Sequence, residues 1–234
     1  MGTFGTHILV KTWLLTTKKM PPTTIKGSMI NKSTNKPTPF SRRFRGLLPV
    51  VIDVETSGLN PMTDALLEIA AVTLKMGDDG KLLRDNTIAY HVEPFQGARL
   101  EKEALEINGI DPANPLRYAI PESQALHRIF ARVREHMERD GCYRAILVGH
   151  NAWFDLSFLL AAAKRSGIRH IPFHTFTTFD TASLAAISLG ETVLARATKR
   201  ARIAFDMSQA HSAIYDAERT AELFCYITNK WGCI

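Results

Sequence analysis

Five residues of this sequence combine the side-chain types needed for metal-assisted chemistry: Asp53, Glu55, Asp155, His211 and Asp216. Four carboxylates gathered in one site repel each other strongly unless a cation lies between them. Ligands that are all carboxylate oxygens suit Mg²⁺ or Mn²⁺ and do not suit Zn²⁺. Two such ions about 4 Å apart can activate a water molecule and stabilise the leaving oxygen of a phosphodiester. A neutral histidine, with an ordinary pKa of about 6.5, is suited to accept the proton of that water.

The predicted secondary structure places these residues at the ends of strands and the starts of helices. Asp53 and Glu55 stand at the end of the apolar run Leu47–Val54, and residues two apart on a strand point to the same face. Asp155 begins a helix directly after another short strand, and Asp216 lies near the start of the last helix. Each motif has an ordinary alternative, because acidic residues in a first helical turn commonly act as caps. The catalytic interpretation therefore depends on the three motifs together.

Strand and helix patterns alternate from about Arg42 onwards, which predicts an α/β domain. The predicted strands are Leu47–Val54, Leu67–Leu74, Thr87–Val92, Ala145–Val148 and Thr177–Phe179. The predicted helices are Leu100–Asn108, Pro121–Arg139, Asp155–Ser166, Thr181–Leu189, Val193–Arg200 and Ser212–Asn229. Ligands of open α/β sheets usually bind at the carboxyl ends of the strands, which is where Asp53 and Glu55 stand.

Residues 1–40 differ in composition from the rest of the chain. They are rich in Thr, Lys, Asn, Ser and Pro, so they cannot bury enough apolar surface to offset the entropy lost on ordering. We interpret them as a disordered tail, or as the product of a start site assigned too early, since Met20 and Met29 are in-frame alternatives. Residues 41–234 then form the domain.

Composition and charge narrow the classes of function. The 234 residues carry a net charge of +6 with a pI of about 9.3, which favours a polyanionic partner. The three cysteines, Cys142, Cys225 and Cys233, lack metal-ligand spacing and are typical of reduced thiols in a cytoplasmic protein. No apolar run approaches the roughly 18 residues of a membrane span, and we identify no signal peptide. We therefore expect a cytoplasmic protein without a membrane partner.

The order and spacing of the motifs Asp-x-Glu, His-Asn-x-x-Phe-Asp and His-x-x-x-x-Asp resemble the three exonuclease motifs of the DEDDh family. The similarity is greatest to the bacterial members that trim the 3′ ends of RNA. It is carried by the stretches Phe44–Gly46, Val50–Gly58, His91–Phe95, Asn108–Pro112 and Phe173–Thr181. The resemblance runs from about Arg43 to Trp231. It implies a ribonuclease H-like fold, with a mixed five-stranded sheet flanked by helices.

The resemblance also implies an activity, a 3′→5′ exoribonuclease that trims short 3′ overhangs of transfer RNA and other stable RNAs. Such an enzyme releases 5′-mononucleotides. By this resemblance Asp53, Glu55, Asp155 and Asp216 would hold two Mg²⁺ ions, with Mn²⁺ as an alternative, and His211 would be the general base. We also expect a side activity on single-stranded DNA, because neither the metal site nor base stacking senses the 2′-OH directly.

The family's RNA-binding positions carry over to several further residues. Phe154 and Phe176 match positions where aromatic rings wedge the 3′-terminal bases, although packing in the core is the common role of such rings. Leu59 and Ile107 stand at two more of these positions with aliphatic side chains, which puts the strength of stacking and the base preference in question. Glu103 matches an acidic residue that contacts a terminal base.

Basic residues form the remaining predicted RNA contacts. Arg43, Arg45, Arg144 and Arg169 fall at or near the positions of the family's nucleic-acid patch. In the similar family members this patch serves the active site of the partner subunit, so a homodimer is implied. A separate cluster, Lys199-Arg200-Ala201-Arg202, indicates only an affinity for phosphate.

Three other interpretations remain open at this point. A DNA exonuclease, such as a proofreading subunit, shares all five catalytic residues. A nucleic-acid binding module that has lost its chemistry is expected to lack at least one of them, and all five are present. A membrane-surface protein that uses the Lys-rich tail needs an amphipathic helix, and residues 1–40 show no clear pattern of that kind.

Overall fold

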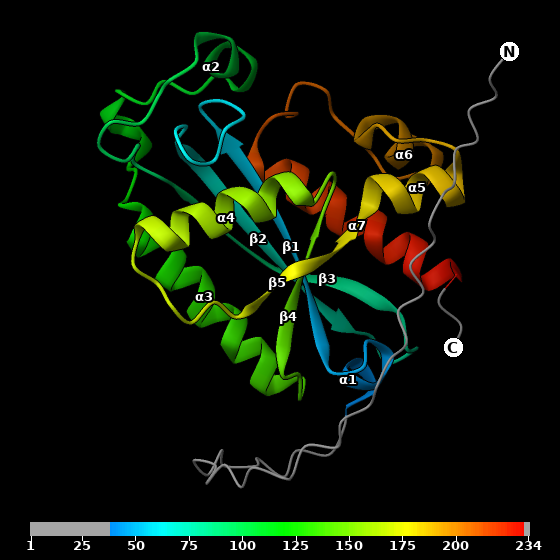
Figure 1. The fold of residues 1–234 in the computed structure, drawn as a ribbon. Coiled ribbons are helices and arrows are strands. Elements are labelled where there is room, and N and C mark those ends of the chain that lie inside the picture. The colour runs from blue at the N-terminus through cyan, green and yellow to red at the C-terminus, as the bar shows by residue number, and fades with distance from the viewer. Residues whose placement is uncertain (1–37, 232–234) are drawn as a thin grey trace, which may run out of the picture. The chain divides into compact units, whose positions relative to one another are not determined.

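A mixed five-stranded sheet lies at the centre of the computed structural model, which describes residues 38–231 (Figure 1). Its strands are β1 (Leu47–Thr56), β2 (Leu66–Met76), β3 (Leu82–His91), β4 (Arg144–Gly149) and β5 (Phe173–Asp180). They are arranged in the order β3-β2-β1-β4-β5. β1, β2 and β3 pair antiparallel, whereas β4 runs parallel to both β1 and β5. The predicted fold class, a mixed sheet of five strands flanked by helices, is confirmed.

The central strand β1 explains why the sequence shows a continuous apolar run there. It lies between β2 and β4, and its residues Leu48–Ile52 are buried. A strand covered on both faces has no solvent-exposed face and so does not alternate in polarity. Because β1 and β4 are parallel, their carboxyl ends, near Glu55 and Gly149, lie at the same edge of the sheet.

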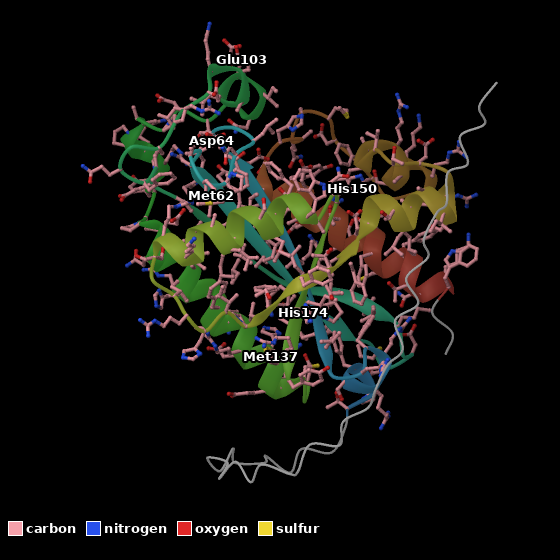
Figure 2. The ribbon with its side chains drawn as sticks, in the orientation of Figure 1. Met62, Asp64, Glu103, Met137, His150 and His174 are labelled. Atoms are coloured by element: carbon pink, nitrogen blue, oxygen red, sulfur yellow. The ribbon has the colours of Figure 1, made fainter. Side chains whose placement is uncertain are left out.

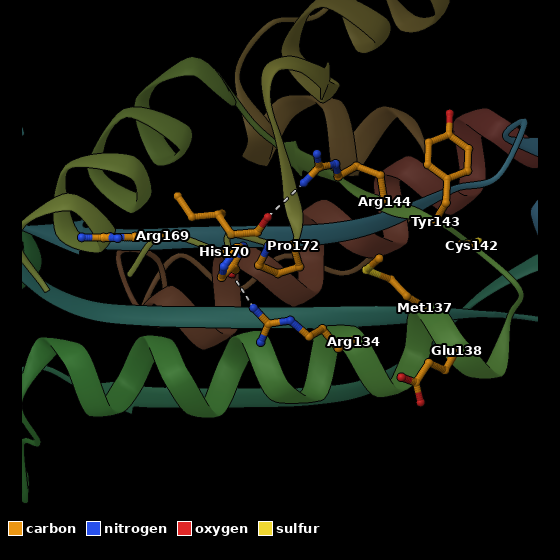
Figure 3. A pocket seen from close by; sticks show the side chains of 10 residues that line it. Arg134, Met137, Glu138, Cys142, Tyr143, Arg144, Arg169, His170 and Pro172 are labelled. Carbon is orange, nitrogen blue, oxygen red and sulfur yellow. Dashed lines mark hydrogen bonds between the residues drawn. The ribbon is translucent and has the colours of Figure 1, made fainter. Parts of the chain in front are cut away.

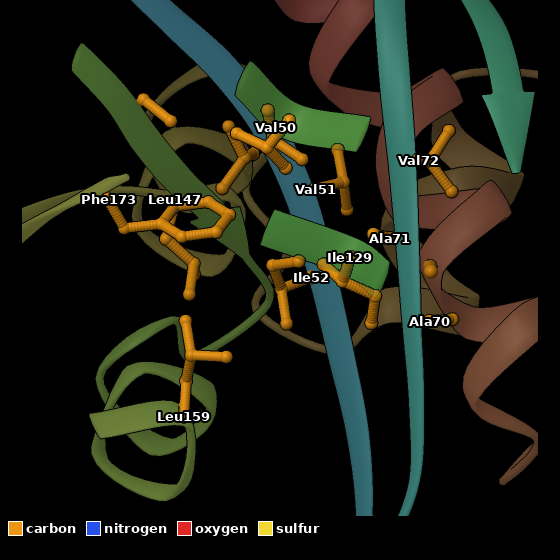
Figure 4. Close-up of a cluster of buried hydrophobic side chains, with 14 of the residues drawn as sticks. Val50, Val51, Ile52, Ala70, Ala71, Val72, Ile129, Leu147, Leu159 and Phe173 are labelled. Atoms are coloured by element: carbon orange, nitrogen blue, oxygen red, sulfur yellow. The ribbon is translucent and has the colours of Figure 1, made fainter. Parts of the chain in front are cut away.

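Helices cover both faces of the sheet. α3 (Glu122–Arg139) and α4 (Trp153–Arg165) pack on one face, and α7 (Ala213–Trp231) packs across β1, β2 and β3 on the other (Figure 1). The main core contains buried side chains from the sheet, from α3 and from α4. Ile52, Ile129 and Leu159 are examples (Figure 4). This packing fixes the starts of α4 and α7 against the carboxyl end of β1.

The remaining elements are short. They are α1 (Pro39–Arg43), α2 (Lys102–Asn108), the 3₁₀ helix η1 (Pro115–Arg117), α5 (Thr181–Leu189) and α6 (Leu194–Arg200). α1 is not predicted from the sequence, and the predicted boundary between residues 40 and 41 falls inside it. Its Phe40 is buried in the core, and Thr38 caps it by accepting a hydrogen bond from the Ser41 N–H. Residues 1–37 of the predicted tail lie outside the described part of the chain.

Candidate active site

Three of the predicted carboxylates converge at the carboxyl end of β1. Asp53 and Glu55 come from the end of this strand, and Asp216 comes from the first turn of α7. One side-chain oxygen from each lies within 4.8 Å of the other two. The convergence follows from two local facts: residues two apart on a strand share a face, and α7 crosses the sheet with its first turn over that face.

The fourth carboxylate, Asp155, is buried beside the same strand. Its Oδ1 accepts a hydrogen bond of 3.1 Å from the backbone N–H of Val54, the residue between the two acidic residues of β1. Gly149, at the end of β4, leaves room for it, because a Cβ at this glycine would lie 2.9 Å from Asp155 Oδ2. Asp155 is therefore tied to the backbone that carries Asp53 and Glu55.

Burial and mutual repulsion raise the pKa values of these carboxylates. The pKa of Asp53 is well above its usual range, mainly because of burial and then because of the charge of Asp155. Burial, together with the charges of Asp216 and Glu68, raises the pKa of Glu55 to about 8. Burial likewise raises the pKa of Asp155 and of Asp216. The cluster therefore holds its negative charge poorly by itself.

Asp216 shows that the cluster fits a divalent cation. Its Oδ2 accepts a hydrogen bond of 3.0 Å from the backbone N–H of His211, whereas its buried Oδ1 has no hydrogen-bond partner among residues 38–231. A buried acceptor without a partner is costly, on the order of 1–3 kcal/mol. Carboxylate oxygens are the ligands that Mg²⁺ and Mn²⁺ prefer, so a bound cation removes this cost and the repulsion together.

His211 stands beside the carboxylates on the loop that precedes α7. Its side chain is exposed and its backbone is left-handed, with φ of 66°, a conformation that costs energy in residues other than glycine. The hydrogen bond to Asp216 holds this conformation. Nearer its start, the loop is anchored by Arg219, whose guanidinium donates to the Ala204 carbonyl at 3.1 Å, and by the edge contact of Phe205 with Tyr215.

One acidic residue near the site, Glu68, is not among those predicted from the sequence. Glu68 of β2 stands directly across from Glu55 in the antiparallel pair, and its charge helps to raise the pKa of Glu55 and of Asp53. Its Oε1 lies 2.8 Å from Nδ1 of His91. The available signal is a charged residue inside the otherwise apolar run Leu66–Val72.

The histidine of the second motif has a structural role in this arrangement. His150 directly follows β4 (Figure 2). Its Nε2 lies 2.7 Å from the Thr192 carbonyl, and its Nδ1 lies 3.0 Å from Oγ1 of Thr181. These bonds join the end of β4 to the segment between α5 and α6. The nearby Asp180 caps α5 and also accepts a hydrogen bond from the Ala152 N–H at the start of α4.

The predicted base-contacting residues are mostly exposed. Leu59, Ile107 and Phe176 have exposed fractions of 82%, 65% and 89%, so their apolar side chains are accessible from solvent. Glu103 is exposed on α2 (Figure 2). Phe154 is half-buried and packs on Phe158, with ring centroids 4.9 Å apart. The first three are therefore free to make further contacts, whereas Phe154 takes part in the core.

The predicted basic patch lies at the other end of the sheet. Arg144 and Arg169 line a cavity of about 480 Å³ at the start of β4 and β5 (Figure 3). Arg43 and Arg45 line a second cavity, and Tyr143 borders both. Two guanidinium groups are already bound within the chain. Arg43 donates to the carbonyls of Gly80 and Thr228, and Arg144 donates to that of Ile171.

The length of β1 separates this patch from the carboxylates. Leu47, at the start of β1, pairs with Arg144, and Asp53 lies six residues farther along the same strand. At about 3.3 Å per residue this corresponds to roughly 20 Å. The patch and the carboxylates of one chain therefore occupy opposite ends of the sheet.

Comparison with known proteins identifies relatives at high identity. Residues 50–224 match a protein-family model described as exonuclease. Ribonuclease T of Yersinia enterocolitica is 61% identical over 192 residues, covering 82% of this chain and 89% of its own. Ribonuclease T of Hahella chejuensis is 57% identical over 203 residues, covering 86% and 93%.

Solved structures with a similar fold are more distant in sequence. The nuclease domain of 3′hExo, a DEDDh family member bound to rAMP, superposes with a TM-score of 0.63 at 17% identity, covering 78% of this chain and 92% of that one. Exonuclease I of E. coli, in complex with a dT13 oligonucleotide, gives a TM-score of 0.59 at 18% identity, covering 78% and 41%. Among residues 38–231, none of the helices combines the length and apolarity needed to cross a membrane.

Proposed function

The chain belongs to the exonuclease family, and from that premise we propose that it is a 3′→5′ exoribonuclease that trims short 3′ overhangs of transfer RNA and other stable RNAs in the cytoplasm. The observation that carries the proposal is the convergence of Asp53, Glu55 and Asp216 within 4.8 Å of one another. The buried, unpartnered Oδ1 of Asp216 supports it, because a cation accounts for this atom.

Four carboxylates, those of Asp53, Glu55, Asp155 and Asp216, would hold the divalent ions, two Mg²⁺ or alternatively Mn²⁺. When bound, such ions activate a water molecule and stabilise the charge on the leaving oxygen of the phosphodiester. Their charge would also offset the burial and the mutual repulsion that raise the pKa values of Asp53 and Glu55.

The remaining residues of the site move a proton and hold the RNA end. His211 stands exposed beside Asp216 and is suited to accept the proton of the attacking water as general base. Phe176, Leu59 and Ile107 present exposed apolar surface for the terminal bases, and an aromatic ring stacks on any base. Glu103, with Phe154, completes the predicted contacts to the terminal nucleotides.

The distance between the two ends of the sheet supports a homodimer. Arg43, Arg45, Arg144 and Arg169 lie roughly 20 Å from the carboxylates of the same chain. This separation leaves the patch available to an RNA strand whose 3′ end enters the active site of the partner subunit. Mixed dimers provide the test. Inactive Asp53→Asn chains and weakly binding Arg45→Ala chains should regain activity when they are mixed, because one composite site is then intact. No regain of activity would contradict this arrangement.

The function itself is tested with a short RNA labelled at its 5′ end. We expect stepwise shortening from the 3′ end with Mg²⁺ and none with EDTA. Asp53→Asn should abolish turnover and leave RNA binding largely intact, and the matched exposed carboxylate variant Glu135→Gln should leave turnover unchanged. Bound RNA that is never shortened, with either Mg²⁺ or Mn²⁺, would contradict the proposal. Faster shortening of the same sequence as DNA would favour the DNA exonuclease instead.

A further inference from the structure

A second group of cations lies on α6 and the turn that follows it. Arg196, Lys199, Arg200 and Arg202 are all exposed. Residues three and four apart share one face of a helix, so the first three form a stripe along α6. Arg200 pairs with Glu191 at 3.4 Å. In the described part of the chain, no acidic side chain forms a salt bridge with the other three. These four residues are called the α6 patch below.

The backbone at Arg202 adopts a strained conformation. Its φ of 61° is left-handed, and it occupies the position after the C-cap Ala201 that glycine usually takes. The N–H of Arg202 donates to the Lys199 carbonyl and that of Ile203 to the Thr198 carbonyl, at 3.1 and 2.8 Å. An arginine here is strained where a glycine would be relaxed.

The α6 patch adjoins the loop that carries the predicted general base. Lys199 and Arg202 border an open cavity of about 630 Å³ whose other wall includes Phe205 and Met207. The chain continues from this cavity through the anchored loop to His211, and Figure 1 shows the loop passing from α6 to the start of α7. The α6 patch therefore lies on the active-site side of the molecule, unlike the arginines at the start of β4 and β5.

We propose that the α6 patch binds the phosphates of the double-stranded stem that adjoins the single-stranded 3′ end of the substrate. The inference rests on the proposed function. The patch presents cations but no exposed aromatic ring, since Phe205 is half-buried against Tyr215. Single strands are gripped by phosphate contacts together with stacking on such rings, whereas a duplex hides its bases and offers its phosphates alone. The chemistry of the α6 patch therefore matches a duplex, while the exposed Phe176 matches a single strand.

The test compares two fluorescent RNAs, a hairpin with a short single-stranded 3′ end and the same 3′ end without the stem. Binding is followed by anisotropy in EDTA over a range of salt concentrations, so no cleavage occurs. Arg202→Gly should weaken hairpin binding and lower the slope of log K against log salt by about one. Because glycine relaxes the turn, the same variant should melt higher, by about 2–4 °C.

A double variant, Arg196→Ala with Lys199→Ala, removes two charges without changing the turn, and alanine keeps the helix. It should lower the slope for the hairpin by about two and leave the single strand unaffected. Arg132→Ala, an exposed cation on α3, is the matched control and should change neither slope. An unchanged hairpin slope in both α6 variants would overturn the inference, as would an equal loss for both RNAs. Failure of the exonuclease assay would overturn the proposed function instead, because binding is measured without turnover.

Discussion

Replacing Glu55 by glutamine should stabilise the metal-free protein while abolishing its activity. The reason lies in the pKa of Glu55, which burial and the charges of Asp216 and Glu68 raise from 4.5 to about 8. The folded protein then holds a proton at pH values where the unfolded chain has released it. A carboxyl group of this kind makes folding less favourable as the pH rises from 4.5 through about 8. Glutamine has the same shape and no proton to lose, so it escapes this loss.

The size of the effect follows from the shift. One pH unit of difference corresponds to about 1.4 kcal/mol, so the variant should gain ~1 kcal/mol near pH 5 and ~3 kcal/mol near pH 7. Above about pH 8 the gain levels off near ~5 kcal/mol, because both folded and unfolded Glu55 are then ionised. For a domain of this size, each kcal/mol shifts the melting temperature by about 2–4 °C. Near pH 7 the expected rise in melting temperature is therefore about 6–12 °C.

Thermal unfolding in EDTA between about pH 5 and pH 9 measures this difference directly. The matched control is Glu135→Gln on α3, which removes an exposed carboxylate paired with Arg132 and should change stability by less than about 1 kcal/mol. Adding Mg²⁺ should raise the melting temperature of the unmodified protein more than that of the variant, since a ligand stabilises the state that binds it.

Two results would refute this reasoning. A difference in melting temperature that does not grow with pH would mean that Glu55 ionises freely in the folded protein. A wild type that becomes more stable than the variant at high pH would mean that a cation of the chain already neutralises the cluster. In either case the carboxylates would not require a metal ion for charge balance.

Three further predictions address the other parts of the site. His211→Ala should lower kcat by about 10²–10⁴ without weakening RNA binding; loss of binding with unchanged kcat would remove it as the base. Arg45→Ala should weaken RNA binding and lower the salt slope by about one in titrations at several salt concentrations. Phe176→Ala should weaken binding of a single-stranded 3′ end by about 1–3 kcal/mol, yet leave the melting temperature unchanged because the ring is exposed. A fall in melting temperature would assign the ring to packing.

The sequence predicts best those elements whose local signals and tertiary environment agree. The buried run Leu47–Val54 forms β1, Thr181–Leu189 is a helix with the predicted bounds, and α2 ends at Gly109 in the left-handed conformation typical of a C-cap. β5 is less well predicted. It begins at Phe173, four residues before the predicted Thr177. The sequence does not indicate this start, because Thr175–Thr177 is exposed at the sheet edge and shows no apolar run. The five-residue α1 depends on the burial of Phe40, a tertiary contact without a local signal.

The same limit applies to the candidate site. The convergence of Asp53 and Glu55 follows from strand periodicity alone. The position of Glu68 opposite Glu55 depends on the register between β1 and β2, which includes a bulge next to Glu55. A single sequence does not specify that register, so a carboxylate that shapes the site electrostatically was missed. The left-handed backbone of His211 and of Arg202 likewise depends on hydrogen bonds that form only in the folded chain.

The separation of charge in this molecule has a consequence for how it takes up RNA. Without a cation, Asp53, Glu55, Asp155 and Asp216 offer no positive charge to a phosphate, and the residues expected to hold the terminal bases are mainly apolar. The attraction for RNA comes instead from cations away from the cluster, including the α6 patch, which contribute to the net charge of +6. Binding in EDTA therefore reports these cations with little contribution from the active site, and the gain in affinity on adding a divalent ion reports the 3′ end entering it. For that reason the slope of log K against log salt, measured in EDTA, isolates the phosphate contacts made by these cations. An RNA that binds only when the divalent ion is present would be held at its 3′ end alone.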